Sequence, residues 1–182
     1  MRLTVYTDYA LRVLMYAALH SDRLPTISEI SETYGVSRNH IMKVVYELGV
    51  AGYIETVRGQ RGGLRLARPP SEIVLGEVVR RTEPDMALMP CFDPSGAASA
   101  GRTVCAIAPA CRLKRALQQA AAAFFAVLDG YTLADLTENG DVLRDLLGLA
   151  PRPVAPDPRT LSPAAAELEP VAAAPSRKSR RA

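Results

Sequence analysis

Cysteine is scarce in this chain of 182 residues, and its three copies, Cys91, Cys105 and Cys111, fall in one short stretch. Three thiols cannot all pair as disulfides, and a reducing compartment would keep them available as thiolates. The apolar run at residues 13–19 falls far short of the roughly 20 residues that a membrane-spanning helix needs. We therefore predict a cytoplasmic location and no membrane partner.

Catalytic signatures are also missing. The sequence contains no phosphate-binding glycine loop, no nucleophile elbow and no paired acid–base constellation. It also lacks the Cys-x-x-Cys pairs that usually mark zinc sites. These absences disfavour an enzyme or an iron–sulfur electron carrier, and we expect the chain not to be an enzyme.

Charge is distributed unevenly along the chain. The net charge is only +3, but residues 37–68 carry six Arg and Lys side chains against two glutamates, while residues 71–150 are net acidic. A local basic strip of this kind is typical of a phosphate-binding face. Tryptophan is absent and alanine is abundant, which favours a helix-rich protein.

The basic strip begins within a helix-turn-helix pattern. Thr26 and Glu29 have the spacing of a capping box, and Ser37 can cap a further helix after only Gly35-Val36. Two helices joined so tightly match a DNA-binding helix-turn-helix. Together with apolar periodicity near the N-terminus, these signals predict helices over residues 5–20, 26–35 and 37–50.

Two short strands should follow, over residues 53–58 and 64–67. They flank a glycine-rich tip at residues 59–63, which has arginines beside it and is typical of a wing. In such a domain the start of the second helix enters the major groove, and the wing touches phosphate or a minor groove. The predicted DNA-binding residues are Ser28, Ser37, Arg38, Asn39, His40, Lys43, Arg58 and Arg61.

The remaining sequence predicts further helices. These are a short helix over residues 76–82, a long one from Pro109 to Leu128, and short ones near residues 132–136 and 141–147. The long helix has an apolar stripe that suits dimerisation. The predicted fold is thus mainly α with a small β-hairpin wing: a winged helix-turn-helix domain plus a long dimerisation helix.

These motifs resemble the NsrR and IscR family of iron–sulfur winged-helix regulators over about residues 1–149. The similar stretches occur in order at residues 3–12, 34–40, 51–53, 57–66, 109–114 and 131–136. The segments at residues 7–9 and 37–40 are more similar to the nitric-oxide-sensing branch than to the cluster-assembly branch. The resemblance implies domains at residues 1–83 (DNA-binding), 84–108 (cluster-binding loop) and 109–149 (dimerisation helix and short helices). Residues 150–182 are predicted to be a disordered Pro/Ala-rich tail with a basic end.

The resemblance also implies a function. It implies a homodimeric repressor of an inverted-repeat operator in double-stranded DNA, with one [2Fe-2S] or [4Fe-4S] cluster per subunit that reacts with nitric oxide. Cys91, Cys105 and Cys111 would bind the cluster, and Asp8 of the partner subunit would be the fourth ligand. The cluster-assembly branch uses instead a histidine three residues after its last cysteine, where this chain has Lys114. Residues 92–104 separate Cys91 from Cys105, against about five residues in the family, and a longer loop adds little closure cost.

Alternatives remain open for each of these features. The cysteines could be buried apolar residues, a structural zinc site or a disulfide switch. The last would give a redox regulator of the same fold, and a sensor of iron–sulfur status is a further alternative. Asp8 could be a surface carboxylate that complements a helix dipole. His20 is expected near a helix C-terminus, where positive charge is favourable, and His40 is expected to contact DNA.

Overall fold

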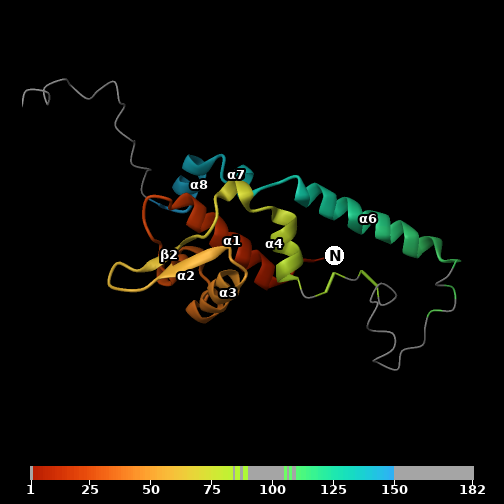
Figure 1. Ribbon diagram of the computed structural model, residues 1–182, viewed down its shortest axis with the longest axis horizontal. Coiled ribbons are helices and arrows are strands. Elements are labelled where there is room, and N and C mark those ends of the chain that lie inside the picture. The colour runs from red at the N-terminus through yellow and green to blue at the C-terminus, as the bar shows by residue number, and fades with distance from the viewer. Residues whose placement is uncertain are drawn as a thin grey trace, which may run out of the picture. The chain divides into compact units, whose positions relative to one another are not determined.

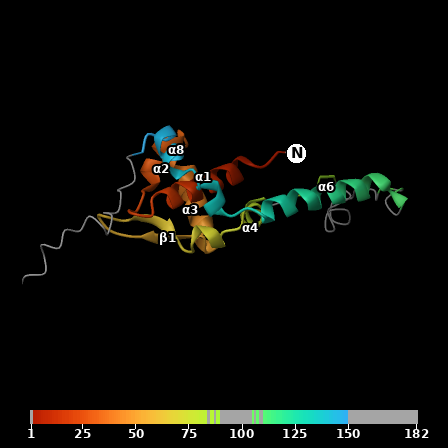
Figure 2. The same ribbon diagram turned by 90° about the horizontal axis from the view of Figure 1, so that it is seen from above.

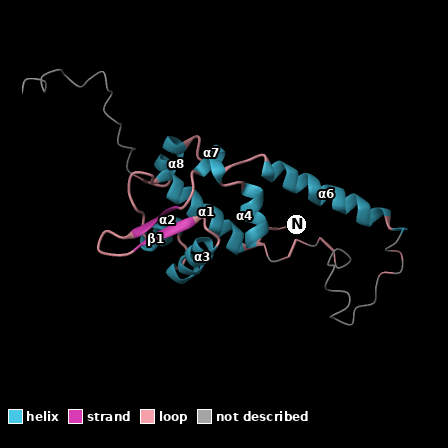
Figure 3. Cartoon of the chain, in the orientation of Figure 1, coloured by secondary structure: helices cyan, strands magenta, loops and turns pink. Residues whose placement is uncertain are grey.

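The computed structural model describes residues 2–83, 85–86, 88–89, 105, 107 and 110–149. Within these ranges the chain is mainly helical with a single antiparallel hairpin, which confirms the predicted fold class (Figures 1 and 3). The elements are α1 (Val5–Leu19), α2 (Ile27–Tyr34), α3 (Arg38–Val50), β1 (Ile54–Val57), β2 (Gly63–Leu66), η1 (Pro70–Glu72), α4 (Leu75–Thr82), α6 (Arg112–Asp129), α7 (Leu133–Leu136) and α8 (Gly140–Leu146).

The helix-turn-helix forms through the caps that the sequence predicts. The Glu29 amide donates to Thr26 Oγ1 at 3.2 Å, and the Thr26 amide donates to Glu29 Oε2 at 2.6 Å, which completes the capping box. Gly35 then takes a left-handed φ of 62° that ends α2, a conformation glycine adopts without steric cost. Ser37 caps α3 by accepting from the His40 amide. These short-range contacts fix the tight connection between α2 and α3.

The hydrophobic core joins α1, α2, α3 and the base of the hairpin. Ala10, Val13, Leu14 and Ala17 of α1 and Ile41, Val44, Val45 and Leu48 of α3 are all buried, at the spacing that a helix with one inward face requires. In the hairpin only Ile54 and Leu64 are buried; Ile54 pairs with Leu66 at the base, and Leu64 lies opposite Thr56, nearer the tip. Each strand is therefore anchored by one buried residue, whereas the tip at residues 58–61 is exposed.

The long helix α6 begins later than the sequence predicts. Its first helical residue is Arg112 and its N-cap is Cys111, because the cysteine sulfur takes the capping position. Pro109, expected in the first turn, lies outside the described residues. None of the 18 residues of α6 is buried in the single chain as described. An amphipathic helix with no buried residue has an apolar face available to a partner.

The C-terminal part of α6 is attached to α4 (Figure 2). The Arg80 guanidinium makes two hydrogen bonds to the Asp129 carboxylate, at 2.7 and 2.6 Å, and lies 4.4 Å from the Phe125 ring centroid. Gly76 makes this approach possible, because a Cβ there would overlap the Asp129 carboxylate. The contact fixes where the long helix joins the helix-turn-helix domain.

The short helices α7 and α8 return the chain to α1. Thr132 and Asp135 form a capping box at the start of α7, and Leu133 is buried in the core. The buried Arg144 of α8 donates to the Leu19 carbonyl at the end of α1. The segment after α6 thus contributes Leu133, Leu147 and Leu149 to the same core as the helix-turn-helix.

His20 differs from the sequence prediction. It caps the C-terminus of α1 as expected, but it is only 3% exposed and its ring stacks on Tyr16 at 4.3 Å. Burial lowers the pKa of His20, and this outweighs the hydrogen bond between Nδ1 and the Tyr16 carbonyl. The predicted favourable positive charge is therefore wrong, because desolvation disfavours the imidazolium there.

The predicted tail at residues 150–182 and most of the predicted loop at residues 84–108 lie outside the described residues. Among the helices that the structure describes, none has the length and apolarity to cross a membrane.

Candidate DNA interface and cysteine site

The start of α3 presents its predicted DNA-binding residues to solvent. Because the opposite face of the helix is buried in the core, the side chains of the first turns must project outward. The predicted residues of this region are all exposed: Ser37, Arg38, Asn39, His40 and Lys43. This geometry suits a helix that inserts its N-terminal residues into a groove.

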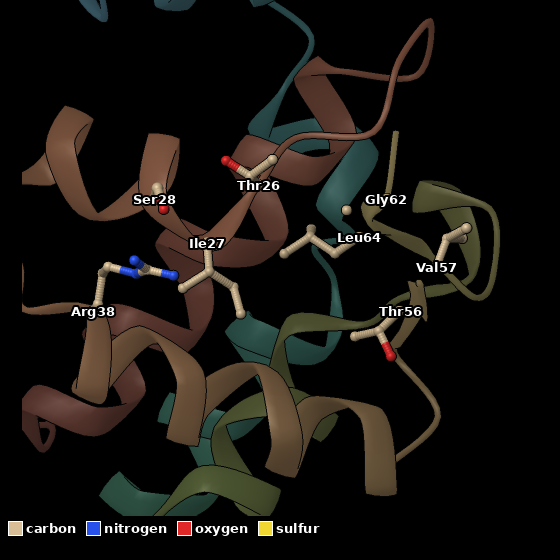
Figure 4. Close-up of a pocket in the computed structure, with 9 residues that line it drawn as sticks. Thr26, Ile27, Ser28, Arg38, Thr56, Val57, Gly62 and Leu64 are labelled. Atoms are coloured by element: carbon tan, nitrogen blue, oxygen red, sulfur yellow. The ribbon is translucent and has the colours of Figure 1, made fainter. Parts of the chain in front are cut away.

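A pocket of about 420 Å³ lies where α2, α3 and the hairpin meet. Figure 4 shows the Arg38 side chain extending from α3 toward Ser28 and Ile27 at the start of α2. Thr56, Val57, Gly62, Gly63 and Leu64 of the hairpin form the opposite wall. The structure thus brings Ser28 and Arg38, predicted separately from the sequence, to one surface.

Glycines let the hairpin approach α2 closely. A Cβ on Gly63 would lie 2.6 Å from the Pro25 carbonyl oxygen, far inside normal contact, and the neighbouring Leu64 amide donates to that same oxygen at 2.9 Å. Gly59, at the tip, has a φ of 120° that other residues rarely adopt. Gly63 therefore lets β2 lie directly against the segment that leads into α2, and Gly59 allows the turn at the tip.

The basic strip divides into paired and free side chains. Arg65 binds Glu55 across the hairpin at 2.7 Å, and Arg68 lies over the Tyr53 ring. The other four bases form no ion pair within the described part of the chain; they are Arg38, Lys43, Arg58 and Arg61. All four are exposed, so their charges remain available to phosphate.

Asp8, the predicted fourth ligand, is exposed in the first turn of α1. Its Oδ1 accepts from Arg12 Nε at 2.9 Å, and the Arg12 guanidinium lies 5.5 Å from the Tyr34 ring of α2. The hydrogen bond with Asp8 raises the pKa of Arg12 and outweighs its partial burial. Within one chain Asp8 therefore belongs to a link between α1 and α2.

Two of the three cysteines are described, and both are free thiols. Cys105 is exposed and Cys111 is half-buried, whereas Cys91 lies outside the described residues. The Lys114 amide donates to Cys111 Sγ at 3.3 Å. Among the residues that the structure describes, no three His, Cys, Asp or Glu side chains gather as a metal site.

Sequence reasoning missed Glu83, which follows α4 and is almost fully buried. Its Oε1 lies 2.7 Å from the Thr4 amide, 3.1 Å from Thr4 Oγ1 and 2.5 Å from Thr7 Oγ1. Burial alone would raise the pKa of Glu83, but these hydrogen bonds lower it. Glu83 thus fastens the end of α4 to the start of α1, next to Asp8, and no local sequence pattern marks such a long-range contact.

A helix-turn-helix with a basic recognition helix beside a basic hairpin defines a winged-helix DNA-binding regulator. The Rrf2 family, described as iron-dependent transcriptional regulators, matches residues 3–139, and the chain belongs to this family.

Relatives and solved structures agree with this assignment. The chain is 49% identical to the HTH-type transcriptional regulator NsrR of Bacillus subtilis over 148 residues, covering 81% of this chain and 97% of that protein. It is 45% identical to the regulator of the same name from Halalkalibacterium halodurans, covering 83% and 100%. The fold is similar to that of CymR, the global cysteine regulator of B. subtilis, with TM-score 0.60, 23% identity and coverage of 76% and 98%. It is also similar to T. potens IscR, with TM-score 0.59, 23% identity and coverage of 79% and 91%.

Proposed function

We propose that this chain is a cytoplasmic, non-enzymatic, homodimeric repressor that binds an inverted-repeat operator in duplex DNA. Each subunit holds one iron–sulfur cluster through Cys91, Cys105 and Cys111. The state of this cluster sets the affinity for the operator, and nitric oxide changes that affinity by reacting with the cluster. The observation that carries the proposal is the Cys111 thiol, free and placed at the N-cap of a long helix whose other end is attached to the basic winged-helix domain. The nitric-oxide signal rests on the similarity to the NsrR regulators.

The described donors fit such a cluster. Clusters need soft thiolate ligands, and hydrogen bonds to the sulfurs tune their properties. Cys105 and Cys111 are free, and the Lys114 amide supplies a hydrogen bond to Cys111 Sγ. When bound, a cluster would supply iron that can take a small diatomic ligand. A lysine ammonium has no lone pair to offer to iron, so Lys114 does not replace a histidine ligand.

Asp8 offers a route from the cysteine site to the DNA reader. Asp8 pairs with Arg12, and Arg12 contacts Tyr34 of the first helix of the helix-turn-helix. Metal binding by the Asp8 carboxylate in the partner's site would draw electron density from its oxygens, so Asp8 would accept more weakly from Arg12 and the contact between α1 and α2 would loosen. Coupling of about 1–3 kcal/mol is sufficient to change operator affinity 5- to 150-fold.

The dimer would be built through α6. Its apolar side chains include Leu113, which is exposed, and the half-buried Leu117, Phe124 and Leu128. Two copies joined along this helix would present two α3 helices to half-sites about one helical turn apart.

Cysteine substitution tests the proposal. Cys105→Ala and Cys111→Ala, purified without oxygen, should lose iron, visible absorption and the response of operator binding to nitric oxide. The exposed α8 variant Asp141→Asn should keep all three and serves as the control. Unchanged iron content and an unchanged nitric oxide response in both cysteine variants would refute the cluster assignment.

A redox regulator with the same DNA reader is the second candidate. It is favoured by the exposure of Cys105, which leaves that thiol open to oxidants. Such a protein would be colourless when purified without oxygen, and oxidation would add a disulfide detectable by mass spectrometry. Visible absorption that nitric oxide bleaches would exclude it.

A further inference from the structure

The outward face of α3 carries apolar side chains that the proposed function has not used. Met42, Tyr46 and Val50 are 44%, 68% and 61% exposed. They recur every four residues, so they form one line along the helix, which we call the apolar ridge. Exposed apolar side chains grouped in this way usually mark a binding surface.

The apolar ridge continues the surface predicted to contact DNA. Asn39 and Lys43 lie on the same outward side of α3, opposite the buried face. Beside the ridge, Gly49 faces the backbone of β1, and on the other side the His40 ring lies 6.1 Å from the Tyr9 ring of α1. The ridge therefore lies on α3 between the side of the helix that contacts β1 and the side that contacts α1.

Charge complementarity indicates what covers the ridge. Four exposed bases on α3 and the wing form no ion pair within the described residues, so the surroundings are cationic. The one acid of α3, Glu47, lies near Tyr6 of α1: the pKa of Tyr6 is raised mainly by burial and further by the charge of Glu47. Glu47 is therefore on the side of α3 that faces α1. A polyanion with apolar groups at its centre fits this surface. The major groove of DNA has one such group, the C5-methyl of thymine.

We propose that Met42 and Tyr46 contact thymine methyl groups in the major groove, so that each operator half-site has A·T pairs opposite α3. The inference rests on the proposed function and adds which base pairs are read. At 1.5 Å rise per residue, Met42 and Tyr46 lie about 4.5 and 10.5 Å along the axis from Asn39. A base pair occupies about 3.4 Å, so the three side chains span about three base pairs. Asn39 would take an adenine at one end, since asparagine pairs with its N6 and N7 atoms.

Replacing thymine by deoxyuridine tests the contact directly. Duplexes are first selected from a random library with the full-length protein purified without oxygen, and thymines of the enriched half-site are then replaced one at a time. Deoxyuridine keeps every hydrogen-bonding group and removes only the methyl. At a contacted thymine we expect the Kd to rise about fourfold for one half-site and about fifteenfold for both.

Variants assign each methyl to a side chain. Met42→Ala should be insensitive to deoxyuridine at one position and Tyr46→Ala at a neighbouring one, whereas Met42→Leu keeps an apolar contact and should stay sensitive. Val142→Ala, at an equally exposed apolar position on α8, should behave as the wild type. Both ridge residues are exposed, so circular dichroism should show native folding.

Two results would overturn the inference while leaving the proposed function intact. The first is equal deoxyuridine sensitivity in the wild type, Met42→Ala and Tyr46→Ala. The second is altered sedimentation of these variants with unchanged DNA affinity, which would assign the ridge to a protein contact. If no duplex is enriched at all, the regulator function fails and the inference fails with it.

Discussion

Glu83→Ala should destabilise the domain far more than substitution of an ordinary surface glutamate. The Glu83 carboxylate is 8% exposed and accepts from the Thr4 amide, the Thr4 hydroxyl and the Thr7 hydroxyl. These hydrogen bonds join the end of α4 to the first turn of α1. Alanine removes this acceptor. The buried Thr7 hydroxyl then has Thr82 Oγ1, at 2.9 Å, as a remaining hydrogen-bond acceptor.

The magnitude follows from the number of donors that lose their acceptor. A hydrogen bond to a charged group contributes about 1.5–3 kcal/mol, but the exposed Thr4 can bind water instead and Thr7 keeps Thr82. We therefore expect a loss of about 2–3 kcal/mol, or roughly 5–10 °C in Tm for a domain of this size. Glu83→Gln keeps an acceptor and should lose about 1 kcal/mol.

Urea unfolding at several pH values measures this contribution. The pKa of Glu83 is lowered from its ordinary 4.5, so its stabilisation is complete above that pH and is lost as the pH falls through the lowered value. The difference between wild type and Glu83→Ala should therefore be large at neutral pH and shrink in acid. Glu77→Ala, exposed on the same helix, is the control. Equal urea midpoints for wild type and Glu83→Ala at pH 7 would refute the reasoning.

Three further predictions concern other parts of the domain. The wild type should lose stability as the pH falls below about 6.5, because His20 binds a proton more readily in the unfolded chain than in the folded one, where its pKa is lowered. His20→Phe should reduce this loss. Urea midpoints measured from pH 7 to 5 test the prediction, and the same pH dependence in the variant and the wild type would contradict it. Gly76→Ala should displace the Asp129 carboxylate from α4 and so speed hydrogen exchange a few-fold in the last turn of α6. The amides of α3 serve as the control. Unchanged exchange in α6 would mean that this contact does not hold the helix. Leu117→Asp should weaken dimerisation about 30-fold or more by sedimentation, whereas Gln118→Asp should not; a dimer that withstands Leu117→Asp would exclude α6 as the interface.

The sequence predicted the helix-turn-helix well because its signals are local. Capping by Thr26 and Ser37 and the left-handed Gly35 each depend on residues only a few positions apart, and the core faces follow from helical periodicity. The same holds for Thr132 and Asp135 in α7.

Contacts between distant segments could not be predicted in this way. The bonds from Glu83 to Thr4 and from Arg80 to Asp129 span 79 and 49 residues, and polar residues at such separations carry no periodic signal. The charge of His20 was misjudged for a related reason. Its position at the end of a helix could be predicted from the sequence, but its burial against the Tyr16 ring could not. The exposure of the predicted DNA-binding residues on α3 was easier to predict, because the positions that the core periodicity of a helix leaves out are the exposed ones.

Because α6 has no buried residue, the stability of the protein should depend on its concentration. If this helix is covered only when two chains meet, the melting temperature will rise with protein concentration, since association stabilises the folded form by mass action. The number of molecules in a cell would then determine both how much of the protein is folded and how strongly its target genes are silenced.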